Sequence, residues 1–231
     1  MSSPINAITP ALFQHATPQT FVIGNSTLAK VLIDATPGAA ASGTNPALYG
    51  GGTVIDITAV STDSTARDVI TYIGTIATTQ GSATGAMTTT TSAIVRASGS
   101  FVTDGWQVGD LVMTFAPFGT AANTAQDGVL GIVTTVAALT LTVNGTPLAV
   151  LTLAAGTRIV KVVQKLRATV AISAGSNGTT ASLGLLGHQM DGSSIRSELK
   201  LGANNMLIAA MQAAVSALPA YVSLDAVLAL Y

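Results

Sequence analysis

Apolar and polar residues alternate over short runs along most of the chain, a pattern typical of β-strands with one buried face. The clearest runs cover residues 54–60, 68–76, 111–115, 139–143 and 165–173. Between them lie clusters of Gly, Asn, Asp and Ser, whose backbone freedom or short polar side chains suit tight turns. The pattern therefore predicts a mainly β protein.

A compact group of short predicted strands lies between residues 100 and 145. Trp106, the only tryptophan, follows the turn Asp104-Gly105 and precedes the strand at 111–115. After a polar loop at 119–128, further apolar runs end at Asn144-Gly145, a dipeptide that favours a two-residue hairpin turn. We expect residues 86–158 to form a small antiparallel β module inserted into a larger domain.

The sequence changes character near its end. Residues 203–218 (ANNMLIAAMQAAVSAL) are mostly good helix formers, with Leu207, Met211 and Val215 at i, i+4 and i+8, and Pro219 follows. This spacing places the three apolar side chains on one face of a helix, and a proline commonly follows a helix end. The spacing predicts one C-terminal helix at about 203–218.

These elements suggest a division into three parts. We expect residues 1–51 to form an N-terminal arm with one hairpin, whose strands lie near 20–23 and 28–33. Residues 52–85 plus 159–231 would form the main domain, a jelly-roll-like sandwich or barrel. Its apolar tail at 221–231 predicts a final strand that pairs either with the same sheet or with another subunit.

The composition favours an assembly subunit. Only 8% of the residues are charged and 48% are hydrophobic, against about 25% charged residues in ordinary soluble domains. Because so little charge leaves an isolated monomer poorly solvated, we expect a homo-oligomer, such as a trimer, with largely apolar contacts.

A membrane protein is the alternative, but Thr, Ser, Gly and Asn interrupt every apolar run before the length of about 20 residues that a spanning helix needs. No secretion signal is visible at the N-terminus, so we expect no membrane.

Several kinds of chemistry have no support in the sequence. There is no cysteine, and the net charge of −1 with no basic run argues against direct nucleic-acid binding. The two histidines, His15 and His188, are far apart, and Glu198 is the only glutamate, so we expect no metal site. Gly50 to Gly52 and Gly119-Thr120 lack the order of a phosphate-binding loop. The sequence therefore predicts no cofactor.

One cluster could in principle carry acid–base chemistry. Asp63, Arg67 and Asp68 lie between two predicted strands. The structural interpretation is that Asp63 caps a turn while Arg67 pairs with a carboxylate across it or across a subunit contact, and we favour it. Glu198 and Lys200 flank an apolar residue and are typical of a short strand or a helix lead-in. We therefore assign no catalytic residue and expect no enzyme.

Trp106 has two interpretations. An aromatic ring beside a turn can stack on a sugar, and Tyr72 and the loop at 119–128 could complete such a surface. A lone tryptophan in a β module is more often a core anchor, and we favour that role. Asn25, Asn144 and Asn177 match the N-glycosylation pattern, but without a secretion signal those matches carry no weight.

Two phrases of the sequence resemble a known group of proteins. From Phe101 to Val112 the chain reads F-x-x-D-G-W-x-V-G-D-x-V, and from Val133 to Val143 it reads V-T-x-V-x-x-x-T-L-T-V. This order resembles segments of structural proteins of tailed bacteriophages, including tail-tube and head-decoration proteins. The phrase S-T-D-S-T-A-R at residues 61–67 is similar to a hairpin of jelly-roll-type head decoration, or cement, proteins.

The resemblance implies a virion protein that is assembled in the cytoplasm of the bacterial host. We expect a non-enzymatic capsid decoration protein that binds the major capsid protein, copies of itself, or both, and stabilises the head lattice. The alternative within the same class is a tail-tube subunit that stacks as rings through an extended arm and the C-terminal strand. The alternative from another class is a carbohydrate-binding adhesin module centred on Trp106.

Overall fold

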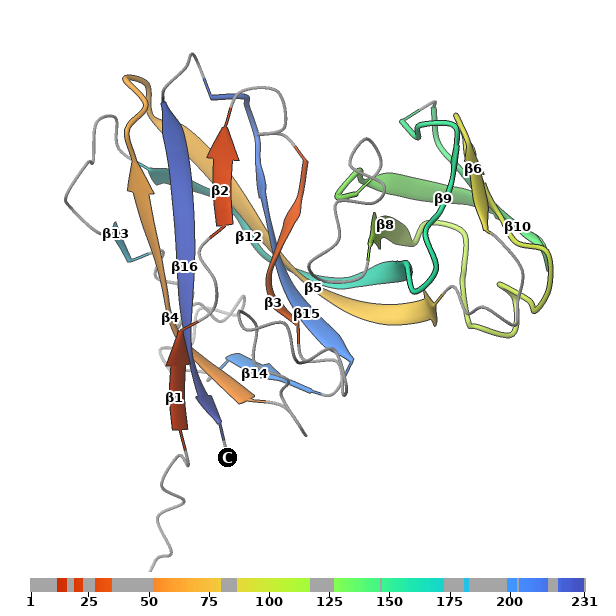
Figure 1. The fold of residues 1–231 in the computed structure, drawn as a ribbon, viewed down its shortest axis with the longest axis horizontal. Helices are drawn as coiled ribbons and strands as arrows, with labels where there is room; N and C mark the ends of the chain where they lie inside the picture. The colour runs from red at the N-terminus through yellow and green to blue at the C-terminus, as the bar shows by residue number, and fades with distance from the viewer. Residues whose placement is uncertain are drawn as a thin grey trace, which may run out of the picture.

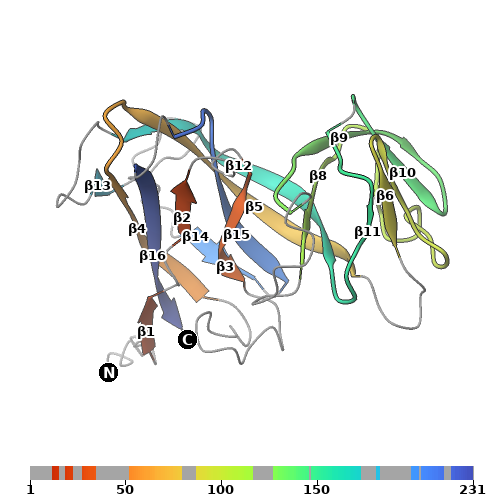
Figure 2. The same cartoon turned by 45° about the horizontal axis from the view of Figure 1, so that its top comes forward.

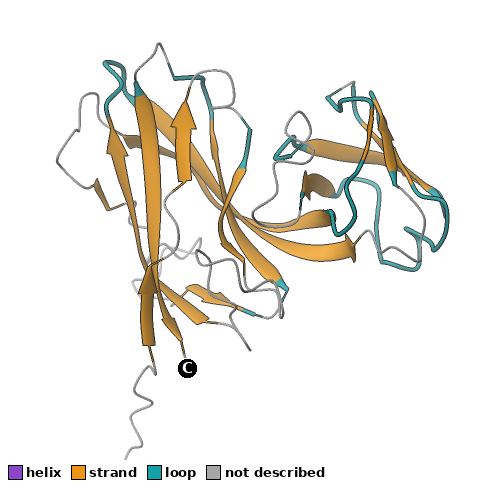
Figure 3. Cartoon of the chain, viewed as in Figure 1, coloured by secondary structure: helices purple, strands orange, loops and turns teal. Residues whose placement is uncertain are grey.

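The computed structural model describes residues 12–15, 19–22, 28–34, 52–79, 87–116, 127–145, 147–172, 181–182, 199–202, 204–215 and 220–230. Every regular element in these ranges is a β-strand (Figure 3), and all the strand pairs are antiparallel. No helix that could span a membrane occurs in this part of the chain. The predicted mainly β class is confirmed.

One sheet has six strands, and the C-terminal strand lies inside it. Its main path follows β1 (Leu12–His15), β16 (Tyr221–Leu230), β4 (Gly52–Ser61) and β13 (Ala181–Ser182). In addition, β2 (Gln19–Val22) pairs with β16, and β14 (Leu199–Leu201) pairs with β4. Strand β16 therefore has β4 along one edge and β1 and β2 along the other, so the apolar tail pairs within its own chain.

The second sheet has ten strands and extends well beyond the first (Figures 1 and 2). Its order is β11 (Leu151–Thr152), β6 (Thr88–Thr90), β7 (Ala93–Val95), β10 (Thr140–Val143), β9 (Gly131–Val136), β8 (Leu111–Phe115), β12 (Arg158–Ile172), β5 (Arg67–Thr79), β15 (Asn205–Met211) and β3 (Lys30–Asp34). Strands β5 and β12, of 13 and 15 residues, pair along most of their length. One end of this two-stranded ribbon faces the six-stranded sheet and the other supports the small strands of 87–157.

Buried apolar side chains form three clusters. The first lies between the two sheets, where Val54, Ile57 and Leu224 of the six-stranded sheet meet Ile73 and Leu207 of the other. The second lies inside the curled strands of the small region and is made of buried residues between 87 and 159. The third covers the opposite face of the ten-stranded sheet from the first. The main body is thus a two-sheet, sandwich-like arrangement.

Strand β15 corrects the predicted C-terminal helix at 203–218, because Asn205–Met211 is a strand paired with β5 and β3. Its alternate side chains belong to different cores: Leu207 and Met211 pack in the first, and Met206 and Ile208 in the third. A strand that is buried on both faces is apolar at every position, so its sequence lacks the period of two that marks most strands. Burial between two neighbouring strands outweighs the helix propensity of Met, Leu and Ala.

The predicted N-terminal hairpin is also wrong. The two strands exist, but β2 pairs with β16 in one sheet and β3 pairs with β15 in the other. Local sequence signals identify a strand and a turn, whereas the partner strand of each lies about 170–205 positions away along the chain. Most of the remaining arm in 1–51 lies outside the described residues.

Candidate functional site

Trp106 is an anchor of the small region's core. Its side chain is 4% exposed and packs in the second cluster. Its indole Nε1–H donates a hydrogen bond of 3.1 Å to the hydroxyl oxygen of Thr78, near the end of β5. A ring buried in this way offers no face for stacking on a sugar, so the structure supports the core role of Trp106.

The Thr78 hydroxyl continues a chain of polar contacts. It donates to Asp104 Oδ2 at 2.6 Å, and the same oxygen forms an ion pair with Arg96 Nη1 at 2.5 Å. The Arg96 guanidinium also lies 4.9 Å from the centre of the Phe101 ring, within the range of a cation–π contact. Four polar side chains thus satisfy one another at the edge of an apolar core, and they tie the loop 96–106 to β5.

Strand β12 is tied to the same region by its basic side chains. Lys161 Nζ forms an ion pair of 2.6 Å with Asp110 Oδ2 and donates to the carbonyl of Gly105 at 3.3 Å. Arg158 Nη2 donates to the carbonyl of Ala116 at 3.1 Å. Burial of Arg158 lowers its pKa to about 10, because a low-dielectric environment disfavours the charged form. Both strands of the ribbon are therefore fixed to the small region by side chains as well as by the sheet.

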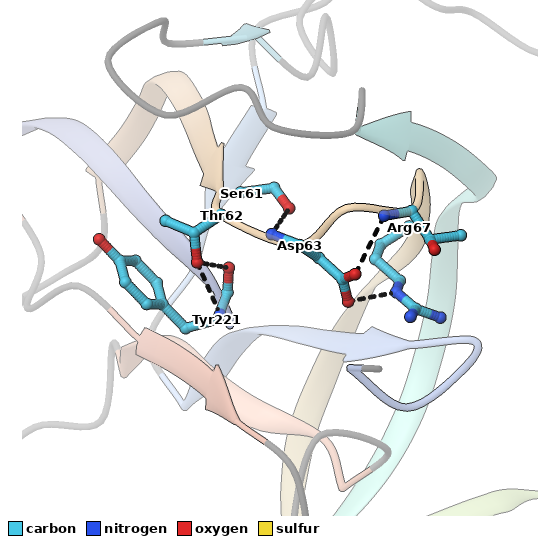
Figure 4. Close-up of polar contacts among 6 residues, drawn as sticks. Ser61, Thr62, Asp63, Arg67 and Tyr221 are labelled. Carbon is cyan, nitrogen blue, oxygen red and sulfur yellow. Dashed lines mark hydrogen bonds and ion pairs between the residues drawn. The ribbon is translucent and has the colours of Figure 1, made fainter. Parts of the chain in front are cut away.

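The turn between β4 and β5 holds the predicted Asp63 cluster, drawn in Figure 4. Asp63 is completely buried; its Oδ1 accepts the Thr65 N–H at 3.0 Å and its Oδ2 accepts Arg67 Nε at 2.7 Å. The Asp63 N–H in turn donates to Ser61 Oγ at 3.1 Å. The interpretation of Asp63 as a turn cap paired with Arg67 is confirmed. Asp68 contributes its backbone carbonyl, which accepts the Gln212 N–H at 2.9 Å.

Thr62, in the same turn, joins it to the C-terminal strand. The Thr62 N–H donates to the Tyr221 carbonyl at 2.9 Å, and the Tyr221 N–H donates to Thr62 Oγ1 at 2.9 Å. This reciprocal pair satisfies backbone groups at the start of β16 (Figure 4). The phrase of residues 61–67 thus fixes the corner between β4, β5 and β16.

Tyr72 lies away from Trp106, in the third core. Its side chain is 5% exposed, and burial raises the pKa of its phenol. It borders an apolar hollow of about 330 Å³ whose lining includes Ile70, Met113 and Met211. The suggested sugar-binding surface of Trp106, Tyr72 and loop 119–128 is therefore not assembled: the two rings are buried in different cores, and residues 119–126 lie outside the described part.

The remaining candidate residues are mostly not described. His188, Glu198, Gly119-Thr120, Asn25 and Asn177 lie outside the described ranges, and His15 and Lys200 are placed only as strand positions on β1 and β14. Asn144 is exposed in the loop after β10. Where side chains are described, no group of three or more His, Cys, Asp or Glu residues could hold a metal ion.

The sequence did not indicate the two ion pairs of the small region. Asp104 and Asp110 each adjoin a glycine, an order typical of turns, and nothing in the sequence near Arg96 or Lys161 marks a partner for either. One general signal was available: charged groups in so apolar a region are stable only when paired. That rule implies pairing but does not select the partners.

In comparisons with known proteins, no family model, curated protein or solved structure matches the chain.

Proposed function

We propose that this chain is a non-enzymatic structural protein of a tailed-bacteriophage virion, and that it decorates the capsid as a cement protein. The proposal is supported by the two sequence phrases that resemble phage structural proteins, because residues in both of them form buried or turn-closing contacts in this fold. The phrase at 101–112 encloses the buried Trp106, and the phrase at 61–67 forms the turn closed by Asp63 and Arg67.

The observation that carries the proposal is the neutral surface of the small region. Between residues 87 and 157 the only charged residues are Arg96, Asp104, Asp110 and Asp127, and none of them is in the exposed class. In contrast, six of the seven exposed large hydrophobic side chains of the described chain lie here: Val102, Val108, Leu130, Ile132, Leu139 and Val150. Surface that carries no exposed charge and several exposed apolar side chains is typical of surface that a partner covers.

A decoration protein is favoured over a tail-tube subunit by the position of β16. The tube alternative uses the C-terminal strand to bind a neighbouring subunit, yet β16 is hydrogen-bonded to β4 on one edge and to β1 and β2 on the other. A strand paired on both edges has no free backbone groups to add to another sheet. The adhesin alternative ranks last because both of its aromatic residues are buried.

The finer fold and the partners belong to the same proposal. The main domain of 52–85 plus 159–231 is a jelly-roll-like sandwich, with 86–158 as its inserted module. This division is supported by the two separate clusters of buried apolar residues, one between the two sheets and one inside the small region. The partners are the major capsid protein and further copies of the chain, for example in a trimer. The virion is assembled in the host cytoplasm, and the net charge of −1 supports contacts with protein instead of nucleic acid or membrane.

Co-sedimentation with phage heads that lack the protein tests this function. We expect saturable binding that persists when NaCl is raised from about 0.1 M to about 1 M, because salt screens charge pairs but not apolar contacts. Loss of binding at high salt would contradict docking through the neutral surface. Hollow tubes formed by the protein alone would favour the tail alternative, and binding to a glycan array without head binding would favour the adhesin.

A further inference from the structure

Asn144 and Gly145 are the first two residues of the loop that follows β10, and both are exposed. The Asn144 backbone N–H donates to the carbonyl of Ile132 at 2.8 Å, which fixes the end of β10 beside β9. Beyond that bond, neither the Asn144 side-chain amide nor the Gly145 N–H has a hydrogen-bond partner among the described residues. A Cβ on Gly145 would meet no atom within 4 Å. The side chain of Asn144 can therefore turn toward the Gly145 nitrogen without losing a contact.

An asparagine that is followed by glycine in such a place can react with its own backbone, because glycine has no side chain to crowd the attacking nitrogen. The Gly145 nitrogen loses its proton to water and attacks Asn144 Cγ. The new C–N bond closes a succinimide ring, and the side-chain nitrogen leaves as ammonia with a proton taken from water. Water then opens the ring at either carbonyl, which gives aspartate or isoaspartate at residue 144. The sequence of steps consumes only water and transfers no electrons.

The other two asparagines of the described ranges lack this combination of features. Asn204 is exposed, but the nitrogen that follows it is engaged, because the Asn205 N–H donates to the Gly202 carbonyl at 3.2 Å. The side-chain oxygen of Asn205 accepts the hydroxyl of Thr75 at 2.9 Å, which holds that side chain in place. Among these three asparagines, only Asn144 has an unbonded side chain, an unbonded following N–H and a glycine as the next residue.

We propose that Asn144 is a site of spontaneous deamidation, at which the folded chain gains one negative charge as it ages. The gain is significant here because none of the charged residues between 87 and 157 is in the exposed class. The new carboxylate would be the first exposed charge of the small region. It would lie beside Ile132, one of the exposed apolar side chains of that region.

Peptide mapping by mass spectrometry tests the modification on the folded, full-length chain. After incubation at about pH 8.5, the peptide with residue 144 should gain the mass difference between an amide and an acid, and fragment ions should assign the change to Asn144. Conversion should be at least about tenfold faster than at about pH 6.5, because the Gly145 nitrogen must lose its proton before it attacks. Asn204 and Asn205 in the same sample should keep their amides.

Two variants separate the chemistry from the fold. Asn144→Gln keeps an exposed amide but must close a larger ring, and Gly145→Ala adds a methyl group beside the attacking nitrogen. Each should slow conversion at least about tenfold, because ring closure depends on the close approach of the two atoms, and circular dichroism shows that each variant is folded. A wild-type amide at residue 144 that survives at high pH would overturn the proposal. Conversion of folded Gly145→Ala at the wild-type rate would also overturn it.

The new charge has a consequence for docking, and this consequence rests on the proposed function. Asn144→Asp carries the same carboxylate in fresh protein, and a charge that is covered without a partner loses its hydration. Asn144→Asp should therefore bind heads at least about tenfold more weakly than Asn144→Gln, its uncharged counterpart. Equal binding of the two variants would overturn this consequence. A wild type that fails to bind heads would sink the proposed function alone, because the peptide map measures the modification independently.

Discussion

The indole N–H of Trp106 and the hydroxyl of Thr78 are joined by a hydrogen bond of 3.1 Å, both residues being at most 5% exposed. Thr78 belongs to a strand of the main ribbon and Trp106 to the core of the small region. This buried contact is one of those that connect the two parts of the chain, and Asp104 and Arg96 extend it.

Two buried threonines on β5 offer a matched comparison. Thr78→Val leaves the Trp106 N–H without its acceptor and removes one of the two donors to Asp104 Oδ2, so we expect a loss of about 1–3 kcal/mol in the free energy of unfolding. The hydroxyl of Thr71, which is fully buried, has no hydrogen-bond partner among the described residues. Thr71→Val should therefore leave stability unchanged or raise it by about 1 kcal/mol. Urea unfolding measures both, and equal effects of the two substitutions would contradict this account of the network.

The Asp63 turn should be sensitive to loss of its carboxylate. Asp63→Ala leaves the largely buried guanidinium of Arg67 and the N–H of Thr65 without their acceptor, so we expect a loss of about 3–5 kcal/mol. Asp68→Ala, which keeps the backbone carbonyl that Gln212 uses, should change stability by less than about 1 kcal/mol. Thermal and urea unfolding of the two variants provide the measurement. A melting curve for Asp63→Ala like that of the wild type would mean that the turn does not depend on this pair.

Two glycines with similar backbone angles separate conformational strain from steric contact. Gly105 has φ +83° and open space where a Cβ would lie, whereas a Cβ on Gly128, at φ +78°, would clash with the backbone of Ala29. Gly105→Ala should cost about 1–2 kcal/mol from the left-handed backbone alone. Gly128→Ala should cost a further 1–3 kcal/mol, roughly the effect of overpacking a close contact. If urea unfolding showed the same loss of unfolding free energy for both variants, the close contact between Gly128 and the backbone of Ala29 would be contradicted.

The C-terminal strand should be essential to the fold. Deleting residues 221–231 removes β16, whose Val222, Leu224 and Ala226 are at most 1% exposed in the core between the sheets. The backbone groups of β4, β1 and β2 would lose their partners at the same time. We expect the truncated chain to lose cooperative unfolding by circular dichroism. A truncated protein with native spectra and a cooperative transition would show that the sheet closes without this strand.

Strands rich in β-branched or aromatic residues could be predicted from the sequence, and a strand made of helix formers could not. Strands β4 and β10 coincide with alternating runs, because a period of two reflects a core on one side. Strands β5, β8 and β15 all have side chains in two different cores, but β5 and β8 contain the Val, Thr and aromatic residues that favour strands. Strand β15 (NMLIAAM) consists mainly of good helix formers, so its apolar run predicts a helix.

Local side-chain chemistry was equally predictable, but long-range pairing was not. The Asp63 turn is closed by residues within four positions of one another, so its sequence contains all of its partners. The Trp106 contact with Thr78 spans 28 positions, and β2 and β3 pair with strands near the other end of the chain. Such partners depend on the closure of the whole sheet, which no short segment encodes.

The most direct test of the proposed virion role is electron microscopy of phage heads that lack the protein, imaged before and after it is added. We predict regular added density on the head lattice and no tubes in the sample of protein alone. Heads that stay bare at saturating concentrations of folded protein would contradict the account.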